Sequence, residues 1–221
     1  MNNNRLKKVL EFIEPSSHLA DVGCDHGYLA IEAIKKGVPF VQLIDNKEGP
    51  LNVAINNLRN YEDECKVVYS LSSGLNSLHE KVDTIAICGM GGELIVQILN
   101  EKLDFAKKMK RLILQANSKN SLLREFLLKN SFIITDEAIV LDKEKVYEII
   151  VCNFVNYSLL YNKKDYWFGP ILRKNKDQLF VNKWKNKLSL DMEILKNNID
   201  FEKKKEIEEE VRLIKEVLYE S

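Results

Sequence analysis

The sequence predicts an α/β protein in which a mostly parallel β-sheet, covered by helices on both faces, is followed by an α-helical hairpin of coiled-coil character. Short apolar runs alternate with helical patterns through about residue 155, which is typical of repeated strand–helix units. The apolar runs are continuous rather than alternating, as expected for strands that are buried on both faces. Beyond residue 156 the strand pattern stops and two amphipathic helical patterns follow.

A helix and then a series of strands and helices are predicted along the first part of the chain. Leu6, Val9, Leu10 and Ile13 recur at helical spacing and predict a helix over residues 5–13. The apolar runs predict strands at residues 18–22, 40–45, 65–71, 82–88 and 111–116. The patterns between and after them predict helices at residues 28–37, 49–61, 92–103 and 120–131. The last apolar stretch, residues 132–155, predicts two or three antiparallel strands.

The C-terminal part predicts a helical module. Its apolar residues recur at helical spacing in two sets, which are Phe180, Trp184, Leu188, Met192, Leu195 and Ile199, followed by Ile207, Val211, Ile214 and Leu218. Two such helices, joined near residues 197–200, would pack as an antiparallel hairpin. We therefore interpret residues 1–156 as one domain and residues 157–221 as a second, helical domain.

The composition excludes several classes of protein. The chain has 221 residues, of which 45% are hydrophobic, and its 33 basic residues balance 33 acidic ones, so a real core is expected. The four cysteines form no close pair and the three histidines are scattered, which favours reduced thiols and no metal site. No signal peptide and no 18-residue apolar run is present. We expect a cytoplasmic monomer without a membrane segment.

Residues 19–30, LADVGCDHGYLA, read as a strand that runs into a glycine-bearing turn and a helix, an arrangement that often binds a nucleotide. The dinucleotide fingerprint needs glycine two positions after Gly23, where this chain has Asp25, and a carboxylate would repel a pyrophosphate. The spacing Asp21-x-Gly23-x-x-x-Gly27 is instead that of the S-adenosylmethionine (SAM) loop of class I methyltransferases. The sulfonium and ammonium of SAM suit nearby acidic groups.

The next strand ends support the same cofactor. Asp45 ends the second strand, 22 residues past Gly23, where an acid can accept hydrogen bonds from both ribose hydroxyls. Ser72, Ser73 and Gly74 follow the third strand, where this fold contacts the adenine. The candidate cofactor-binding residues are Asp21, Gly23, Cys24, His26, Gly27, Tyr28, Asp45, Asn46, Ser72, Ser73, Gly74, Cys88 and Gly89.

The stretch Cys88-Gly89-Met90-Gly91-Gly92 follows the fourth predicted strand, at the expected mouth of the site. Its glycines leave backbone exposed, so a flat acceptor could enter edge-on. The alternative interpretation is a plain tight turn that permits close helix packing.

Seven motifs occur in an order that is similar to the bacterial tRNA (adenine-22-N1)-methyltransferase family. They are ADVGCDHGYLA, NKEGPLNVAINNL, DTIAICGMGGELI, RLILQAN, LLREFLLKNSFIITDE, KVYEIIV and FGPIL, and the resemblance extends over about residues 5–185. It implies a Rossmann-like class I methyltransferase that uses SAM to methylate N1 of an adenine in the tRNA D-arm. The products would be 1-methyladenosine and S-adenosylhomocysteine. Ser73 stands where the family usually has aspartate.

Methylation of N1 leaves the adenine cationic, so a nearby carboxylate or carbonyl would stabilise the developing charge. We assign this role to Asp25, with the backbone of Gly89 and Met90 shaping the slot for the base. Gln115 and Asn117, at the end of the fifth strand, are candidates to hold the base edge. Polar residues at a strand end can equally be simple turn formers.

The stretch between Lys163 and Lys187 holds eight basic and two acidic residues. We predict that Lys174, Lys183, Lys185 and neighbouring basic residues bind tRNA phosphates, while Tyr166, Trp167 and Trp184 are available for stacking. The alternatives are a solvated basic face and aromatic packing. The acidic cluster Glu206, Glu208, Glu209 and Glu210 would repel RNA, so the second helix is expected to face away from it. The competing functions are a methyltransferase of a small molecule and a non-catalytic RNA-binding protein.

Overall fold

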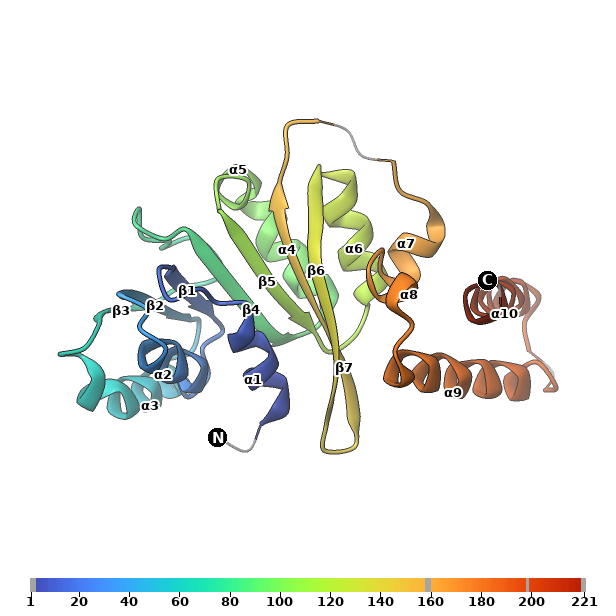
Figure 1. The fold of residues 1–221 in the computed structure, drawn as a ribbon, viewed down its shortest axis with the longest axis horizontal. Helices are drawn as coiled ribbons and strands as arrows, with labels where there is room; N and C mark the ends of the chain where they lie inside the picture. The colour runs from blue at the N-terminus through green and yellow to red at the C-terminus, as the bar shows by residue number, and fades with distance from the viewer. Residues whose placement is uncertain (1–2, 158–159, 198, 220–221) are drawn as a thin grey trace.

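The computed structural model describes residues 3–157, 160–197 and 199–219. It contains a seven-stranded sheet of order β3-β2-β1-β4-β5-β7-β6, with helices on both faces (Figure 1). The strands are β1 (His18–Val22), β2 (Phe40–Asp45), β3 (Lys66–Leu71), β4 (Thr84–Met90), β5 (Arg111–Ala116), β6 (Phe132–Asp142) and β7 (Lys145–Phe154). β1 to β5 are parallel, and β7 runs antiparallel to both β5 and β6. The predicted fold class is confirmed, with two strands in the antiparallel unit.

The helices follow the predicted order, with several short additions. They are α1 (Asn4–Glu11), α2 (Tyr28–Lys35), α3 (Glu48–Leu58), α4 (Gly92–Glu101), α5 (Leu103–Ala106), α6 (Asn120–Lys129), α7 (Lys163–Phe168), α8 (Leu172–Asn175), α9 (Gln178–Ile194) and α10 (Phe201–Tyr219). The 3₁₀ turn η1 (Arg59–Tyr61) extends α3. Within the described residues, no helix combines the length and the apolar character that crossing a lipid bilayer requires.

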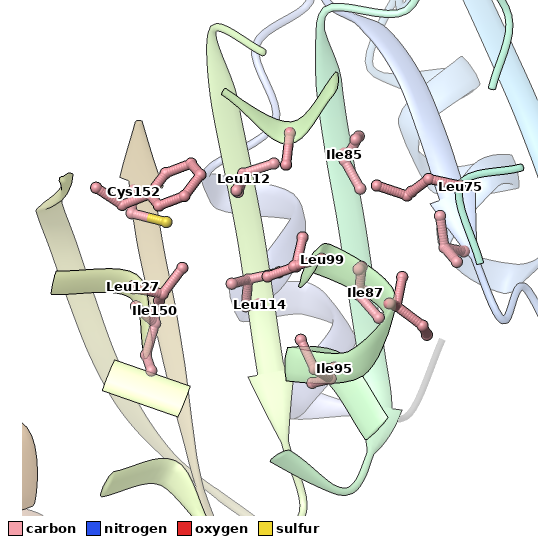
Figure 2. Packing of buried hydrophobic residues seen from close by; sticks show 14 of the residues in the cluster. Leu75, Ile85, Ile87, Ile95, Leu99, Leu112, Leu114, Leu127, Ile150 and Cys152 are labelled. Carbon is pink, nitrogen blue, oxygen red and sulfur yellow. The ribbon is translucent and has the colours of Figure 1, made fainter. Parts of the chain in front are cut away.

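Two apolar clusters bury the two faces of the sheet. Ile85 and Ile87 of β4 point to one face, where Ile95 and Leu99 of α4 pack on them (Figure 2). Ala86 of the same strand belongs to the cluster on the other face, which α1, α2 and α3 cover. Strands that are buried on both faces explain the continuous apolar runs in the sequence. The sheet therefore leaves only its edges and strand ends for a site.

The C-terminal helices pack around a third cluster, in which Phe168 and Trp184 lie 4.5 Å apart between ring centroids. The predicted apolar stripe is wrong at Met192, which is 46% exposed, whereas the adjacent Asp191 is buried. The reason is that Asp191 accepts a hydrogen bond from Lys187 at 2.5 Å, so α9 turns a charged pair toward α10 at this level. α9 ends at Ile194, and residue 198 of the predicted junction lies outside the described residues.

A buried charge network joins these helices to the sheet. Arg124 of α6 is fully buried and donates to Glu137 of β6 at 2.7 Å and to Glu148 of β7 at 2.8 Å. Glu148 also pairs with Lys183 of α9, and Glu137 accepts the Ile171 N–H at 2.9 Å. Burial would raise the pKa of Glu148, but the charges of Arg124 and Lys183 lower it overall. The network therefore stabilises contacts between α6, the antiparallel strands and the C-terminal helices.

We expect Glu148→Gln to lower the free energy of unfolding at pH 7 by about 3 kcal/mol, because it leaves part of the buried positive charge uncompensated. Since the pKa of Glu148 is lower in the folded state, this contribution is complete above the unfolded pKa of about 4.3 and is lost as the pH falls through the folded value. Denaturant unfolding of both proteins should therefore give a difference that shrinks below about pH 4.

Glu125→Gln is the matched control, because Glu125 lies on the exposed side of α6 and pairs with Lys129 at 2.6 Å. An exposed pair of this kind contributes less than about 1 kcal/mol. Equal losses in the two variants, or a Glu148→Gln difference that does not change with pH, would contradict the role of the network.

Candidate functional site

The loop between β1 and α2 holds three residues in the left-handed backbone region. Gly23, Asp25 and Gly27 have φ values of 73°, 50° and 74°, which glycine adopts freely and aspartate tolerates. The Gly23 N–H donates to the Ile44 carbonyl at 2.8 Å, so the loop closes over the ends of β1 and β2. A Cβ at Gly23 would overlap the Met90 side chain. The loop can lie against Met90 because residue 23 has no side chain.

Two adjoining cavities open at the carboxyl ends of the parallel strands. The first, of about 250 Å³, is lined by Arg5, Leu6, Asp21, Gly23, Cys24, Asp25, His26, Tyr28, Leu29, Cys88, Gly89 and Met90. The second, of about 120 Å³, is lined by Val22, Gly23, Ile44, Asp45, Asn46, Ser72, Ser73, Gly74, Met90, Leu94, Gln97, Ile98 and Glu101. Because Gly23 and Met90 line both, the two cavities form one groove that the Met90 side chain divides.

Most of the predicted cofactor residues line this groove. The first cavity receives Asp21, Cys24, His26, Tyr28, Cys88 and Gly89, the second receives Asp45, Asn46, Ser72, Ser73 and Gly74, and Gly23 borders both. Asp25 and Met90, predicted to act on the acceptor, lie on the first cavity. Gly27 lines neither cavity. It faces α3 instead, since a Cβ there would lie 2.6 Å from Leu58 Cδ1. Its absence of a side chain lets α3 pack against the loop instead.

Three carboxyl groups give the groove its electrostatic character. Asp21 is 4% exposed, and burial together with the charges of Asp45 and Asp25 raises its pKa to about 7. Asp45 accepts the Lys47 N–H at 2.9 Å and the Asp25 N–H at 3.4 Å. Because a cation in the groove would relieve the repulsion among these groups, the arrangement favours a positively charged ligand.

The thiols of the site are not nucleophiles. Burial raises the pKa of Cys88 to about 12 and also raises the pKa of Cys24. Neither thiol of the groove is therefore ionised at neutral pH. Within the described part of the chain, no cluster of three or more His, Cys, Asp or Glu side chains could hold a metal ion.

Gly89 is predicted to follow the fourth strand, but in the structure it lies within β4 and forms a bulge there. The pairing of β4 with β5 shifts between Cys88 and Met90, and Gly89 has a φ of 81°. Gln115 Oε1 accepts the Gly89 N–H at 3.0 Å, and Asn117 Nδ2 donates to the Gly89 carbonyl at 2.7 Å. Both polar groups of the bulge are thus held by side chains at the end of β5.

The prediction that Gln115 contacts the substrate is corrected by this arrangement. Gln115 is fully buried, and its Nε2 donates to Asn117 Oδ1 at 3.1 Å. Both ends of its amide are engaged, and its oxygen accepts the Gly89 N–H, so Gln115 positions the bulge. Asn117 is exposed and stays a candidate for the base edge.

Arg5 is the principal site residue that the sequence did not reveal. It extends from α1 into the first cavity, donates to Gln115 Oε1, and lies 5.4 Å from the centroid of the Tyr147 ring. Its partners lie 110 and more positions away in the chain, so no local pattern signals the contact. Gln97 and Glu101 of α4, which line the second cavity, were also missed.

The basic C-terminal stretch is largely neutralised. Its ion pairs are Lys163–Glu209 at 2.9 Å, Lys164–Glu216 at 2.9 Å, Lys187–Glu210 at 2.9 Å, Arg173–Asp165 at 2.7 Å, and Lys183 with Glu148. The acidic helix α10 therefore faces this stretch, and Lys183 is engaged in the buried network rather than free for phosphate. Trp184 is 7% exposed and packs on Phe168. Lys174 and Lys185 form no ion pair with any described residue and stay candidates for phosphate binding.

Comparison with known proteins identifies close similarities to one family. A sequence model of the family TrmK, tRNA (adenine(22)-N(1))-methyltransferase, matches residues 19–216. The tRNA (adenine(22)-N(1))-methyltransferase of Bacillus subtilis is 30% identical, covering 98% of this chain and 96% of its own. Its crystal structure superposes with a TM-score of 0.87 at 29% identity over 98% of both chains.

Two further solved structures contain the cofactor or its product. A Streptococcus pneumoniae protein in complex with S-adenosyl-L-methionine has a TM-score of 0.90 at 33% identity, covering 99% of this chain and 100% of its own. M. capricolum TrmK in complex with S-adenosyl-homocysteine has a TM-score of 0.86 at 26% identity, covering 97% of this chain and 96% of its own. These similarities confirm the family that the sequence motifs predicted. The chain therefore belongs to the tRNA (adenine(22)-N(1))-methyltransferase family.

Proposed function

We propose that the chain transfers a methyl group from SAM to N1 of adenine 22 in tRNA, with SAM lying across both cavities of the groove. The observation that carries this proposal is the groove itself, which joins an acidic cavity at Asp21 to a second cavity at Asp45. The adenosine part would occupy the second cavity and the methionine part the first. Family membership supports the same reaction and the same cofactor.

Each half of the groove provides groups that match its half of SAM. The Asp45 carboxylate, which is 8% exposed, is placed to accept hydrogen bonds from the ribose hydroxyls. Ser72, Ser73 and Gly74 border the space for the adenine. Asp21 faces the space for the methionine part, where its ionised form would stabilise the sulfonium and ammonium. Met90 has to move aside for a ligand that spans both cavities.

The residues of the first cavity orient the acceptor base. Bound SAM supplies an activated methyl group, which the lone pair of adenine N1 takes as the carbon–sulfur bond breaks and its electrons return to sulfur. No base catalyst is required, because N1 carries no proton to remove. Asp25, whose side chain is 73% exposed toward solvent and the cavity, stabilises the positive charge that develops on the adenine. The Gly89 bulge fixes the wall against which the base lies.

Adenine N1 lies on the Watson–Crick edge, so the target base has to leave its stack before it reaches this wall, at a cost of roughly a few kcal/mol. Contacts with the rest of the tRNA offset that cost.

The division of the chain into two domains is part of the proposal. Residues 1–156 would carry out the chemistry, and residues 157–221 would form a helical domain. We further propose that the protein acts as a monomer on tRNA in the cytoplasm.

The reaction is tested with radiolabelled SAM and two tRNA transcripts that differ only at position 22, adenine in one and guanine in the other. We expect label in the adenine transcript alone, recovered as 1-methyladenosine when the nucleosides are separated by mass spectrometry. Bound SAM with no label in either transcript would overturn the proposal in favour of another acceptor.

Asp25→Asn should lower kcat about a hundredfold or more while leaving the Kd for tRNA within about twofold, because the charge acts on the developing cation. Asparagine is preferred to alanine here because it tolerates the positive φ of residue 25. Single-turnover kinetics and tRNA binding are measured side by side, with the exposed Asp63→Asn as control. Parallel losses of binding and rate, or an unchanged kcat, would refute the assignment of Asp25.

The affinity for SAM should depend on the protonation of Asp21. Since burial and neighbouring carboxylates raise its pKa to about 7, part of the group is protonated below pH 7, and a cationic ligand has to displace that proton. Relative to Asp21→Asn, the wild-type affinity should therefore increase with pH, by up to about tenfold per unit below pH 7, and level off above pH 8. Calorimetry from pH 5.5 to 8.5 measures this difference, with Asp104→Asn as the exposed control. Parallel profiles for wild type and Asp21→Asn would exclude Asp21 as the cation's partner.

A further inference from the structure

Arg5 stands where the first cavity meets a separate surface groove. This groove, of about 650 Å³, lies between the start of α1 and the β6–β7 turn, and is lined by Asn3, Arg5, residues 142–145 and Tyr147. Figure 1 shows α1 beside the strands that lead to this turn. Among the residues that the structure describes, Arg5 alone borders both the cofactor cavity and this groove. A molecule that reaches from the groove into the cavity has to pass its guanidinium.

The guanidinium of Arg5 has no carboxylate partner among the described residues. Its contacts are the Gln115 amide oxygen and the face of the Tyr147 ring, both neutral. One of its terminal nitrogens lies 3.1 Å from the place that a Cβ on Gly89 would occupy, so it sits directly on the bulge. By contrast, most cations of the C-terminal stretch are held in ion pairs. A guanidinium with spare N–H groups and no ion pair to a described carboxylate can bind an external anion.

The order of the strands shows on which side of the site an anion bound to Arg5 would lie. The residues proposed for the adenosine part of SAM follow β2 and β3, on one side of β1. The partners of Arg5 lie on or after β4, β5 and β7, on the other side of β1, where the acceptor base would enter. Arg5 also lines the first cavity, where the carboxylate of SAM would lie, but it borders the surface groove as well. Because the acceptor is a polyanion that would approach from that surface, we favour its phosphate as the partner of Arg5.

We propose that Arg5 binds the phosphate next to the target adenosine and that the groove between α1 and the β6–β7 turn takes the adjoining nucleotides of the tRNA. The proposal rests on the proposed function of the same site. Lys143 and Lys145 are exposed on the turn and supply the next phosphate contacts. Two acids lie beside them, of which Asp142 accepts the Asn4 N–H at the start of α1 at 3.1 Å. With Arg5, Lys143 and Lys145 against Asp142 and Glu144, the lining of the groove keeps a net positive charge.

Arg5→Met is compared with Lys7→Met, which removes an equal charge from the same helix at an exposed position that lines neither cavity. The Kd for tRNA is measured over a range of KCl concentrations, and the Kd for SAM separately. Arg5→Met should weaken tRNA binding at least about tenfold and reduce the slope of log K against log salt by about 0.7 to 0.9. Its affinity for SAM, and both affinities of Lys7→Met, should stay within about twofold.

Two further variants separate phosphate binding from a structural effect on Gly89. Arg5→Lys keeps the charge but not the planar fork, so it should retain the wild-type salt slope and lose only part of the affinity. The double variant Lys143→Gln and Lys145→Gln leaves the cofactor cavity untouched and should weaken tRNA binding about threefold or more, with a smaller slope.

A loss of SAM affinity with unchanged tRNA binding in Arg5→Met would assign the guanidinium to the carboxylate of SAM and overturn the proposal. An unchanged Kd for tRNA in the double lysine variant would remove the groove from the RNA path. If the wild-type protein neither binds nor methylates tRNA, the proposed function fails first, and that failure is visible before any variant is compared.

Discussion

The hydrogen bonds of Gln115 and Asn117 to Gly89 fix the part of the molecule where cofactor and acceptor would meet. Cys88 pairs with Gln115 and Met90 with Ala116, so one extra residue is accommodated in β4. The extra residue interrupts the hydrogen-bonded ladder, and the side chains at the end of β5 satisfy the polar groups of Gly89 instead. As a consequence, Met90 ends the strand with its side chain over Gly23. The division of the groove, and the wall beside Asp25, both depend on this local arrangement.

The rigid surroundings of this bulge come from burial of the sheet on both faces. Ile113 and Leu114 of β5 belong to opposite apolar clusters, and both are fully buried. The strand that carries Gln115 therefore cannot shift in register without exposing one of these side chains. At the far edge of the sheet, the ion pairs of Arg124 with Glu137 and Glu148 hold the antiparallel strands β6 and β7 to α6. Glu137 and Glu148 also bind Ile171 N–H and Lys183, so the same network joins the C-terminal helices to the sheet.

The sequence predicts the features that depend on neighbours along the chain and misses those that depend on distant ones. Continuous apolar runs predict the strands, and Asp21 and Asp45 are predicted because they stand at fixed positions after Gly23 or at a strand end. Arg5 and the true role of Gln115 depend on contacts between segments far apart in sequence, which no local pattern encodes. The ion pairs of the basic stretch were missed for the same reason, since Glu209 and Glu216, which pair with Lys163 and Lys164, come more than forty residues later.

The position of Met90 has a consequence for the affinity of any bound adenosyl ligand. A ligand that fills both cavities gives up the contact of Met90 with Gly23, and its binding free energy is reduced by that amount. The reduction is the same before and after methyl transfer, because the displaced contact belongs to the protein and not to the ligand. Uniform weakening of this kind leaves the chemical step unaffected and would lower the affinity for the spent cofactor as much as the affinity for SAM.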